Sequence, residues 1–158
     1  MKAISLNDVK KELSELAPSK LLELILRLAK HKKENKELLS YLLFDAENEN
    51  KFIENQKSYM DEEFEVLNKK TIYLTKKGLR RILRNINKNI RFTGSKKTEI
   101  ELLIYFSIKL KDSGIRLSES KVLSNLYQQQ IIRINKAVAL LHEELQSDYK
   151  QDIAQLNL

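Results

Sequence analysis

The segment KKGLRRILRNINKNIRF, residues 76–92, contains seven basic residues and no acidic residue. With the periodicity of an α-helix, its leucine and isoleucine side chains fall on one side and its charges on the other. Six cations share roughly 100° of arc and are named here the basic stripe. They are Lys77, Arg80, Arg81, Arg84, Lys88 and Arg91. The pattern predicts a long amphipathic helix over residues 71–91 that buries its apolar side in a helical core.

The composition of the chain favours an all-helical fold. Its 158 residues include only three glycines and one proline, and 32% of them are charged. A β-rich fold needs many turns, and turns are rich in glycine, proline and asparagine. We therefore predict one all-α domain over residues 1–158, a compact helical bundle or a short array of helical hairpins with six to seven helices.

The first 45 residues are expected to form a three-helix unit. Ser5 and Asp8 have the spacing of a helix-capping box, and Pro18 can open a second helix. Residues 21–29 are apolar nearly all round, which indicates a helix at the centre of the fold. A third helix carries Leu38 to Phe44.

Four more helices are expected after residue 45. The predicted helix over 46–67 has an apolar face and an acidic face, and the basic helix that follows can end at Gly94. Thr98 and Glu101 resemble a second capping box, which would start a very apolar helix. Ser118 can cap one long last helix that reaches about residue 147. The tail over 148–158 is expected to fray.

The order of these motifs resembles that of a family of small bacterial all-helical domains of unknown function. The resemblance rests on LNDVKKELSELAPSKLLELILRLAKHKKENKELLSYLL at residues 6–43, on FIENQKSYMDEEF at 52–64, on the basic KKGLRRILRNI at 76–86, and on ELLIYFSIKLKDSG at 101–114. That family has no established activity. The resemblance implies a helical fold and no particular function.

No set of residues in the sequence has the spacing of a catalytic or metal site. The chain has no cysteine and two histidines, His31 and His142, and each is expected to be an ordinary surface or half-buried side chain. The acids at Asp61, Glu62 and Glu63 are consecutive, so they point to different sides of a helix. We therefore predict a protein that is not an enzyme, with no cofactor, no metal and no small-molecule substrate.

The charge of the chain is concentrated in one segment. Residues 66–98 hold eleven basic and no acidic residues, while the rest holds 18 basic and 22 acidic ones, within a net charge of +7. Like charges three or four positions apart on a helix repel each other, so a face of one sign suggests a partner of the opposite sign. The sequence predicts that the basic stripe binds an acidic protein partner, as in an adaptor; non-sequence-specific nucleic-acid binding is the alternative.

Two further interpretations of the stripe stay open at this stage. The acidic helix over 46–67 could neutralise it inside the protein, or it could be only a solvated face. A membrane surface is less favoured, because the apolar side of the helix is needed by the core. No segment approaches the ~20 apolar residues that span a bilayer, and the N-terminus lacks the apolar stretch of a signal peptide. We expect a cytoplasmic protein.

Overall fold

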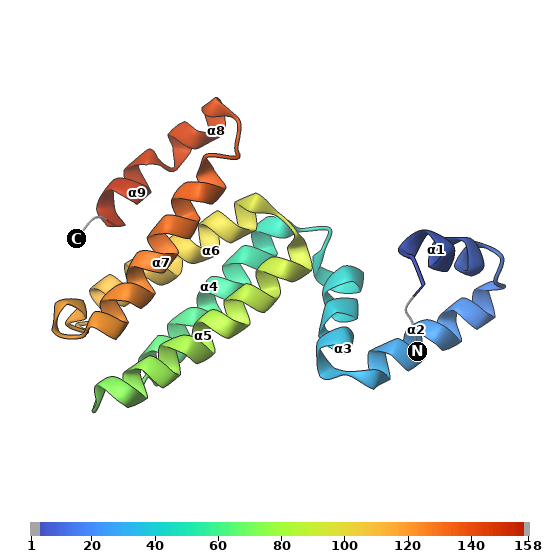
Figure 1. Ribbon diagram of the computed structural model, residues 1–158, viewed down its shortest axis with the longest axis horizontal. Helices are drawn as coiled ribbons and strands as arrows, with labels where there is room; N and C mark the ends of the chain where they lie inside the picture. The colour runs from blue at the N-terminus through green and yellow to red at the C-terminus, as the bar shows by residue number, and fades with distance from the viewer. Residues whose placement is uncertain (1–3, 157–158) are drawn as a thin grey trace. The chain divides into compact units, whose positions relative to one another are not determined.

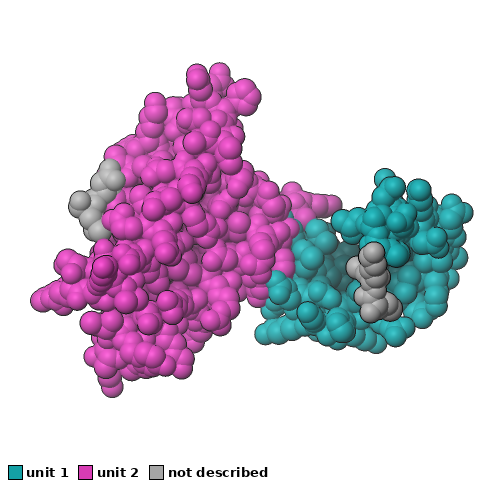
Figure 2. Space-filling model, in the orientation of Figure 1, with its two compact units in different colours: residues 1–45 teal, residues 46–158 magenta. Residues whose placement is uncertain are grey.

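The computed structural model describes residues 4–156, which are helical with no β-strand in that range (Figure 1). The predicted all-α class is confirmed. The predicted number of six to seven helices is too low, because the described residues form nine α-helices together with one short π-helix and one 3₁₀-helix. The chain divides into two compact units, residues 1–45 and 46–158 (Figure 2).

Unit 1 contains three α-helices. They are α1 (Leu6–Ser14), α2 (Pro18–His31) and α3 (Lys33–Ser40), and the π-helix Tyr41–Asp45 continues from α3. The predicted caps are confirmed: Ser5 accepts a hydrogen bond from the backbone N–H of Asp8, and Pro18 is the first residue of α2. Helices α2 and α3 pack against each other, and the Asn35 side-chain amide donates to the Leu28 carbonyl at 2.8 Å.

Helix α2 is not the centre of a core, contrary to the prediction. None of its residues is buried, and Leu22 and Leu28 are 58% and 62% exposed. Tyr41 is the only buried residue between residues 4 and 45. The apolar pattern identified the side of α2 that favours burial, but a pattern on one helix does not say what covers it.

Unit 2 contains the other six α-helices. They are α4 (Glu49–Glu65), α5 (Ile72–Thr93), α6 (Lys96–Asp112), α7 (Lys121–Val138), α8 (Glu143–Asp148) and α9 (Lys150–Leu156), with a 3₁₀-helix at Leu117–Glu119. Helices α4 and α5 form an antiparallel hairpin, and α6 packs against α4, α5, α7 and α9 (Figure 1). Helix α6 is therefore the central helix of unit 2.

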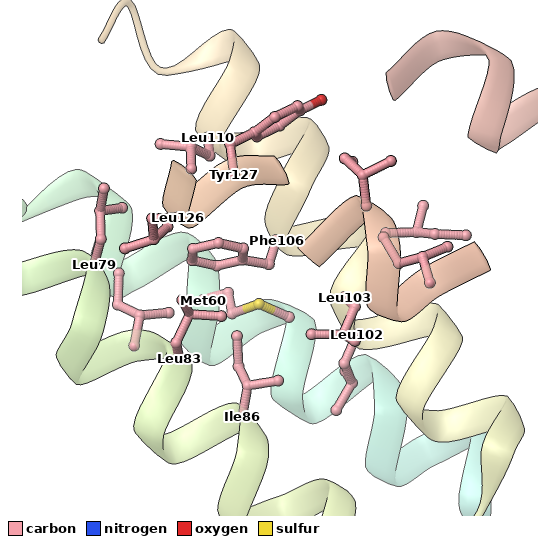
Figure 3. Packing of buried hydrophobic residues seen from close by; sticks show 14 of the residues in the cluster. Met60, Leu79, Leu83, Ile86, Leu102, Leu103, Phe106, Leu110, Leu126 and Tyr127 are labelled. Carbon is pink, nitrogen blue, oxygen red and sulfur yellow. The ribbon is translucent and has the colours of Figure 1, made fainter. Parts of the chain in front are cut away.

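The core of unit 2 is built around α6 (Figure 3). Leu102, Leu103 and Phe106 are fully buried, as are Met60 of α4 and Tyr127 of α7. The Phe106 ring packs at a tilt on Phe64, with 5.7 Å between the ring centres, within the range that aromatic pairs favour. These contacts explain why α6, which is apolar on most sides, is covered on most sides.

The boundary between α5 and α6 is fixed by glycine and serine. Gly94 ends α5 in the left-handed conformation, with φ of 61°, as predicted. The predicted cap of α6 is wrong: Ser95 is the N-cap, and it accepts a hydrogen bond from the Thr98 N–H. Thr98 itself is buried, and its hydroxyl donates to the Glu49 carboxylate at 2.7 Å.

The predicted long last helix is two helices, α7 and α8, in the structure, and a third, α9, forms in the predicted tail. Ser120, and not Ser118, caps α7, which ends at Val138. Helix α9 then packs on α6, and the Tyr127 hydroxyl donates to the Leu156 carbonyl at 2.6 Å. Leu156 is only 1% exposed, so the expected fraying is wrong for residues 148–156; residues 157 and 158 lie outside the described range. The apolar spacing of the sequence continues through residues 139–142, so it did not predict that the chain reverses direction there.

Tyr149 should make the stability of unit 2 sensitive to alkali. Burial, together with the charge of Glu101, raises the pKa of the Tyr149 phenol to about 12. A pKa raised by folding means that the stabilisation is complete below the ordinary tyrosine pKa of about 10 and is lost as the pH rises through 12.

We expect the free energy of unfolding to fall between about pH 10 and pH 12, and to fall less in Tyr149→Phe. Urea melts across this range measure it, with Tyr73→Phe, at an exposed tyrosine, as the control. If the free energy of unfolding depends equally on pH in all three proteins, the Tyr149 phenol does not cause the loss of stability.

Candidate functional site: the basic face of helix α5

Helix α5 buries one side and exposes the opposite one. Leu79, Ile82, Leu83, Ile86 and Ile90 are buried. Of the basic stripe, Lys77, Arg80, Arg81, Arg84 and Arg91 are exposed, and Lys88 is half-buried. The structure thus brings the six predicted residues onto one face of one helix.

Hydrogen bonds of two threonines stabilise the first turn of α5. Thr71 is the N-cap and accepts a hydrogen bond from the Leu74 N–H at 3.2 Å. The Thr75 hydroxyl is buried and donates to the Thr71 carbonyl at 2.9 Å. A capped first turn keeps the stripe helical from its first cation, because the unpaired N–H groups of a helix start are satisfied.

The acidic helix α4 neutralises only part of the stripe. Arg81, at one edge, forms an ion pair with Glu63 of α4. Lys77, Arg80 and Arg84 form no ion pair with any residue between 4 and 156. Other acids of α4 pair with lysines instead: Glu54 with Lys57 at 2.9 Å, and Asp61 with Lys109 at 2.6 Å.

Removal of Glu63 should therefore strengthen the stripe at little cost in stability. The Arg81 side chain is 58% exposed and the Glu63 side chain 19%, and ion pairs that solvent reaches contribute about 0–1 kcal/mol. We expect Glu63→Gln to leave the free energy of unfolding within about 1 kcal/mol in a urea melt. We also expect it to bind an acidic peptide more tightly than wild type in a fluorescence titration.

Glu54→Gln, which removes an acid paired with Lys57 and not with the stripe, is the matched control. A large loss of stability in Glu63→Gln alone would show that Arg81 is a structural residue.

A groove with an apolar floor borders the stripe. It has a volume of about 320 Å³ and is named here the Gly78 groove. Val66, Leu67 and Leu74 provide apolar surface, and Lys77, Arg81 and Arg84 lie around it. A Cβ atom on residue 78 would collide with Leu67 Cδ1, so glycine lets Leu67 lie against α5. The groove can hold an apolar side chain next to cations.

A second groove lies along the other edge of the stripe, between α5 and α7. It has a volume of about 440 Å³ and is named here the amide groove. Its polar lining is Arg80, Asn87, Asn125, Gln129, Gln130 and Arg133, with no acid among its lining residues. The Gln130 Oε1 atom is buried and accepts no hydrogen bond within the described part of the chain.

Arg133 is held in place at the edge of the amide groove. It donates to the Asn87 side-chain oxygen at 2.6 Å and to the Glu99 carboxylate at 2.9 Å. Burial raises the pKa of the Glu99 carboxyl, but hydrogen bonds from Lys96 and Arg133 outweigh this and hold its pKa below the ordinary value. Glu99 is therefore ionised at neutral pH and fixes the arginine.

Sequence reasoning missed both grooves. Arg133 lies outside the basic segment, so charge counting does not connect it with Arg80. The run of three glutamines at residues 128–130 is an available signal, since its polar amides interrupt the apolar pattern of α7. The helix predicted over 46–67 included Val66, but Val66 follows α4 and is 70% exposed.

Neither histidine is part of a cluster of acidic side chains that could bind a metal ion within the described residues. No group of three or more His, Asp or Glu side chains lies close enough to hold a metal ion within residues 4–156. His31 ends α2, and His142 precedes α8. Over the same residues, no helix is both long and apolar enough to span a membrane.

Comparison of the chain with protein-family models, with curated proteins and with solved structures found no match. The resemblance to small bacterial helical domains stays a prediction.

Proposed function

We propose that the protein is a non-enzymatic binding or adaptor protein that engages an acidic protein partner through the basic stripe of α5. The observation that carries the proposal is the absence of ion pairs at Lys77, Arg80 and Arg84 among residues 4–156. Exposed cations repel each other. Binding of an acidic partner replaces this repulsion with attraction, and the opposite charges of the two surfaces also speed association.

The Gly78 groove favours a protein segment as the partner. Its lining combines the cations Lys77, Arg81 and Arg84 with apolar surface of Val66, Leu67 and Leu74. An acidic segment with one leucine or phenylalanine can place its apolar side chain on this apolar surface and its carboxylates on the cations. Arginine suits this role, because its guanidinium binds a carboxylate through two parallel hydrogen bonds.

Nucleic-acid binding is the second candidate, and the amide groove favours it. Asn87, Asn125 and Gln129 line that groove beside Arg80. Asparagine, glutamine and arginine side chains are those that contact base edges most often, and the cations of the stripe can contact phosphates. Both candidates use the cations of the stripe, but the two grooves have different lining residues, so variants in the grooves can separate the candidates.

Fluorescence titrations with two probes test the proposal. One probe is a labelled glutamate-rich peptide with a single leucine, and the other is a labelled DNA duplex. We expect the peptide to bind and the leucine to matter, so that a peptide with alanine at that position binds more weakly. Tighter binding of the duplex, together with no effect of the leucine, would favour the nucleic-acid candidate and contradict the first.

The salt dependence of the affinity for duplex DNA tests the nucleic-acid candidate independently. For duplex DNA, the logarithm of the affinity falls with the logarithm of the salt concentration, with a slope of about −0.9 for each phosphate contacted. Contacts from the whole stripe would give a slope of about −5. A slope near zero would show that any binding of the duplex does not use these cations.

A further inference from the structure

Unit 1 has too little buried apolar surface to hold its helices together alone. Ten large apolar side chains between residues 4 and 45 are exposed, among them Leu22, Ile25 and Leu28 of α2. Only Tyr41 is buried in the same range. Units of this size rarely fold by their own core, and disulfides, metals or oligomerisation usually supply the rest. The chain has no cysteine, so no disulfide serves this purpose.

Three of these exposed side chains, Ile25, Leu28 and Leu42, line one groove on the α2–α3 hairpin. The groove has a volume of about 320 Å³ and is named here the hairpin groove. It is lined by Ile25, Leu28 and Ala29 of α2, by Leu38 and Leu39 of α3, and by Leu42. The one polar lining residue, Asn35, already donates its amide N–H to the Leu28 carbonyl. The groove therefore offers apolar contacts and no charge.

The spacing of these residues fits helices as the occupant. Ile25 and Leu28 are three positions apart, and Leu38 and Leu42 are four apart, which are the steps of a helical seam. A helical hairpin with one open apolar seam is half of a four-helix bundle. Two identical hairpins complete such a bundle with two-fold symmetry, because each supplies the surface that the other lacks.

The nearly balanced charges of unit 1 favour a second copy of the chain as the occupant of the groove over an acidic or a basic partner. Residues 4–45 contain eight basic and seven acidic side chains, whereas residues 46–156 contain 20 basic and 15 acidic ones. A nearly neutral surface of mixed sign does not repel its own copy, and it does not attract a polyanion as the α5 stripe does. A standard interface covers about 800 Å² on each partner, so it would extend beyond the hairpin groove to exposed apolar side chains such as Leu22, one helical turn from Ile25, and Leu43, next to Leu42.

We propose that unit 1 is a homodimerisation element in which the hairpin grooves of two copies pack against each other as a four-helix bundle. This proposal is independent of what α5 binds. It predicts that the full chain has a mass near twice 18.6 kDa in solution at micromolar concentration and dissociates on dilution.

Light scattering after gel filtration tests the proposal with two variants of the full chain. Leu28→Glu places a charge in the hairpin groove, and Leu140→Glu makes the same change at a leucine of unit 2 that is 71% exposed. We expect Leu28→Glu to weaken dimerisation at least 100-fold and Leu140→Glu to leave it unchanged. Wild type that is monomeric at the highest soluble concentration would overturn the proposal.

Thiol crosslinking keeps the proposal testable if Leu28→Glu disturbs unit 1. Because the natural chain has no cysteine, single substitutions Ile25→Cys, Leu28→Cys and Leu42→Cys can be compared directly in the presence of a short bismaleimide. We expect at least one of them to give a crosslinked dimer, and Leu140→Cys to give none. Failure of all three to crosslink would show that something other than a second copy covers the groove.

Discussion

Phe106→Ala should lower the free energy of unfolding by about 3–5 kcal/mol, as truncation of a buried phenylalanine does. Phe106 is fully buried in α6, and its ring packs on Phe64 of α4. The truncation loses the transfer free energy of the ring and leaves a cavity that the surrounding helices fill only partly. Because α6 packs against four other helices, few of its neighbours can move inward without loss of their own contacts.

A urea melt followed by circular dichroism measures this effect. Leu140→Ala is the control: Leu140 is apolar and lies in the same unit, but it is exposed, so its truncation should change stability by less than about 0.5 kcal/mol. A loss under about 1 kcal/mol for Phe106→Ala would mean that α6 is not the centre of the core.

Charge reversal of the unpaired cations should abolish binding and leave the fold intact. The variant combines Lys77→Glu, Arg80→Glu and Arg84→Glu, at three exposed positions that form no ion pair between residues 4 and 156. Each exposed substitution should change stability by no more than about 0.5 kcal/mol. Glutamate at positions 77 and 84 would stand four residues before Arg81 and Lys88, a spacing that favours attractive pairs and offsets part of any loss.

The expected loss of affinity for an acidic peptide is at least about 100-fold. A hydrogen bond to a charged group contributes about 1.5–3 kcal/mol, and about 1.4 kcal/mol corresponds to a tenfold change in affinity. The variant removes three such groups and replaces them with charges that repel the peptide. Arg81 is left unchanged because its ion pair with Glu63 would confuse a stability effect with a binding effect.

The basic helix could be predicted from the sequence because its signals are local. The positions of Leu79, Ile82 and Ile86 specify a helix with one buried face, and Gly94 specifies its end. The same reasoning placed the six cations together. It did not show that Glu63 reaches Arg81, because that contact joins residues 18 positions apart on two helices.

Features that depend on packing between helices could not be predicted in this way. Residues 121–156 have continuous apolar spacing, yet the chain reverses after Val138 so that Leu156 can be buried. Leu28 carries the same apolar signal as Leu103, but one is exposed and the other is buried. Apolar spacing gives the side of a helix that favours burial, while the partner depends on the arrangement of the whole chain.

The most direct test of acidic-partner binding by the basic stripe is one titration of a labelled acidic peptide against three proteins. They are wild type, the variant with Lys77, Arg80 and Arg84 changed to Glu, and a control with Lys121, Lys136 and Lys150 changed to Glu. The control makes the same change in net charge at exposed lysines outside the stripe. We expect salt-dependent binding by wild type and the control, and none by a stripe variant with an unchanged thermal melt. Equal binding by all three proteins, or no binding by wild type, would contradict this expectation.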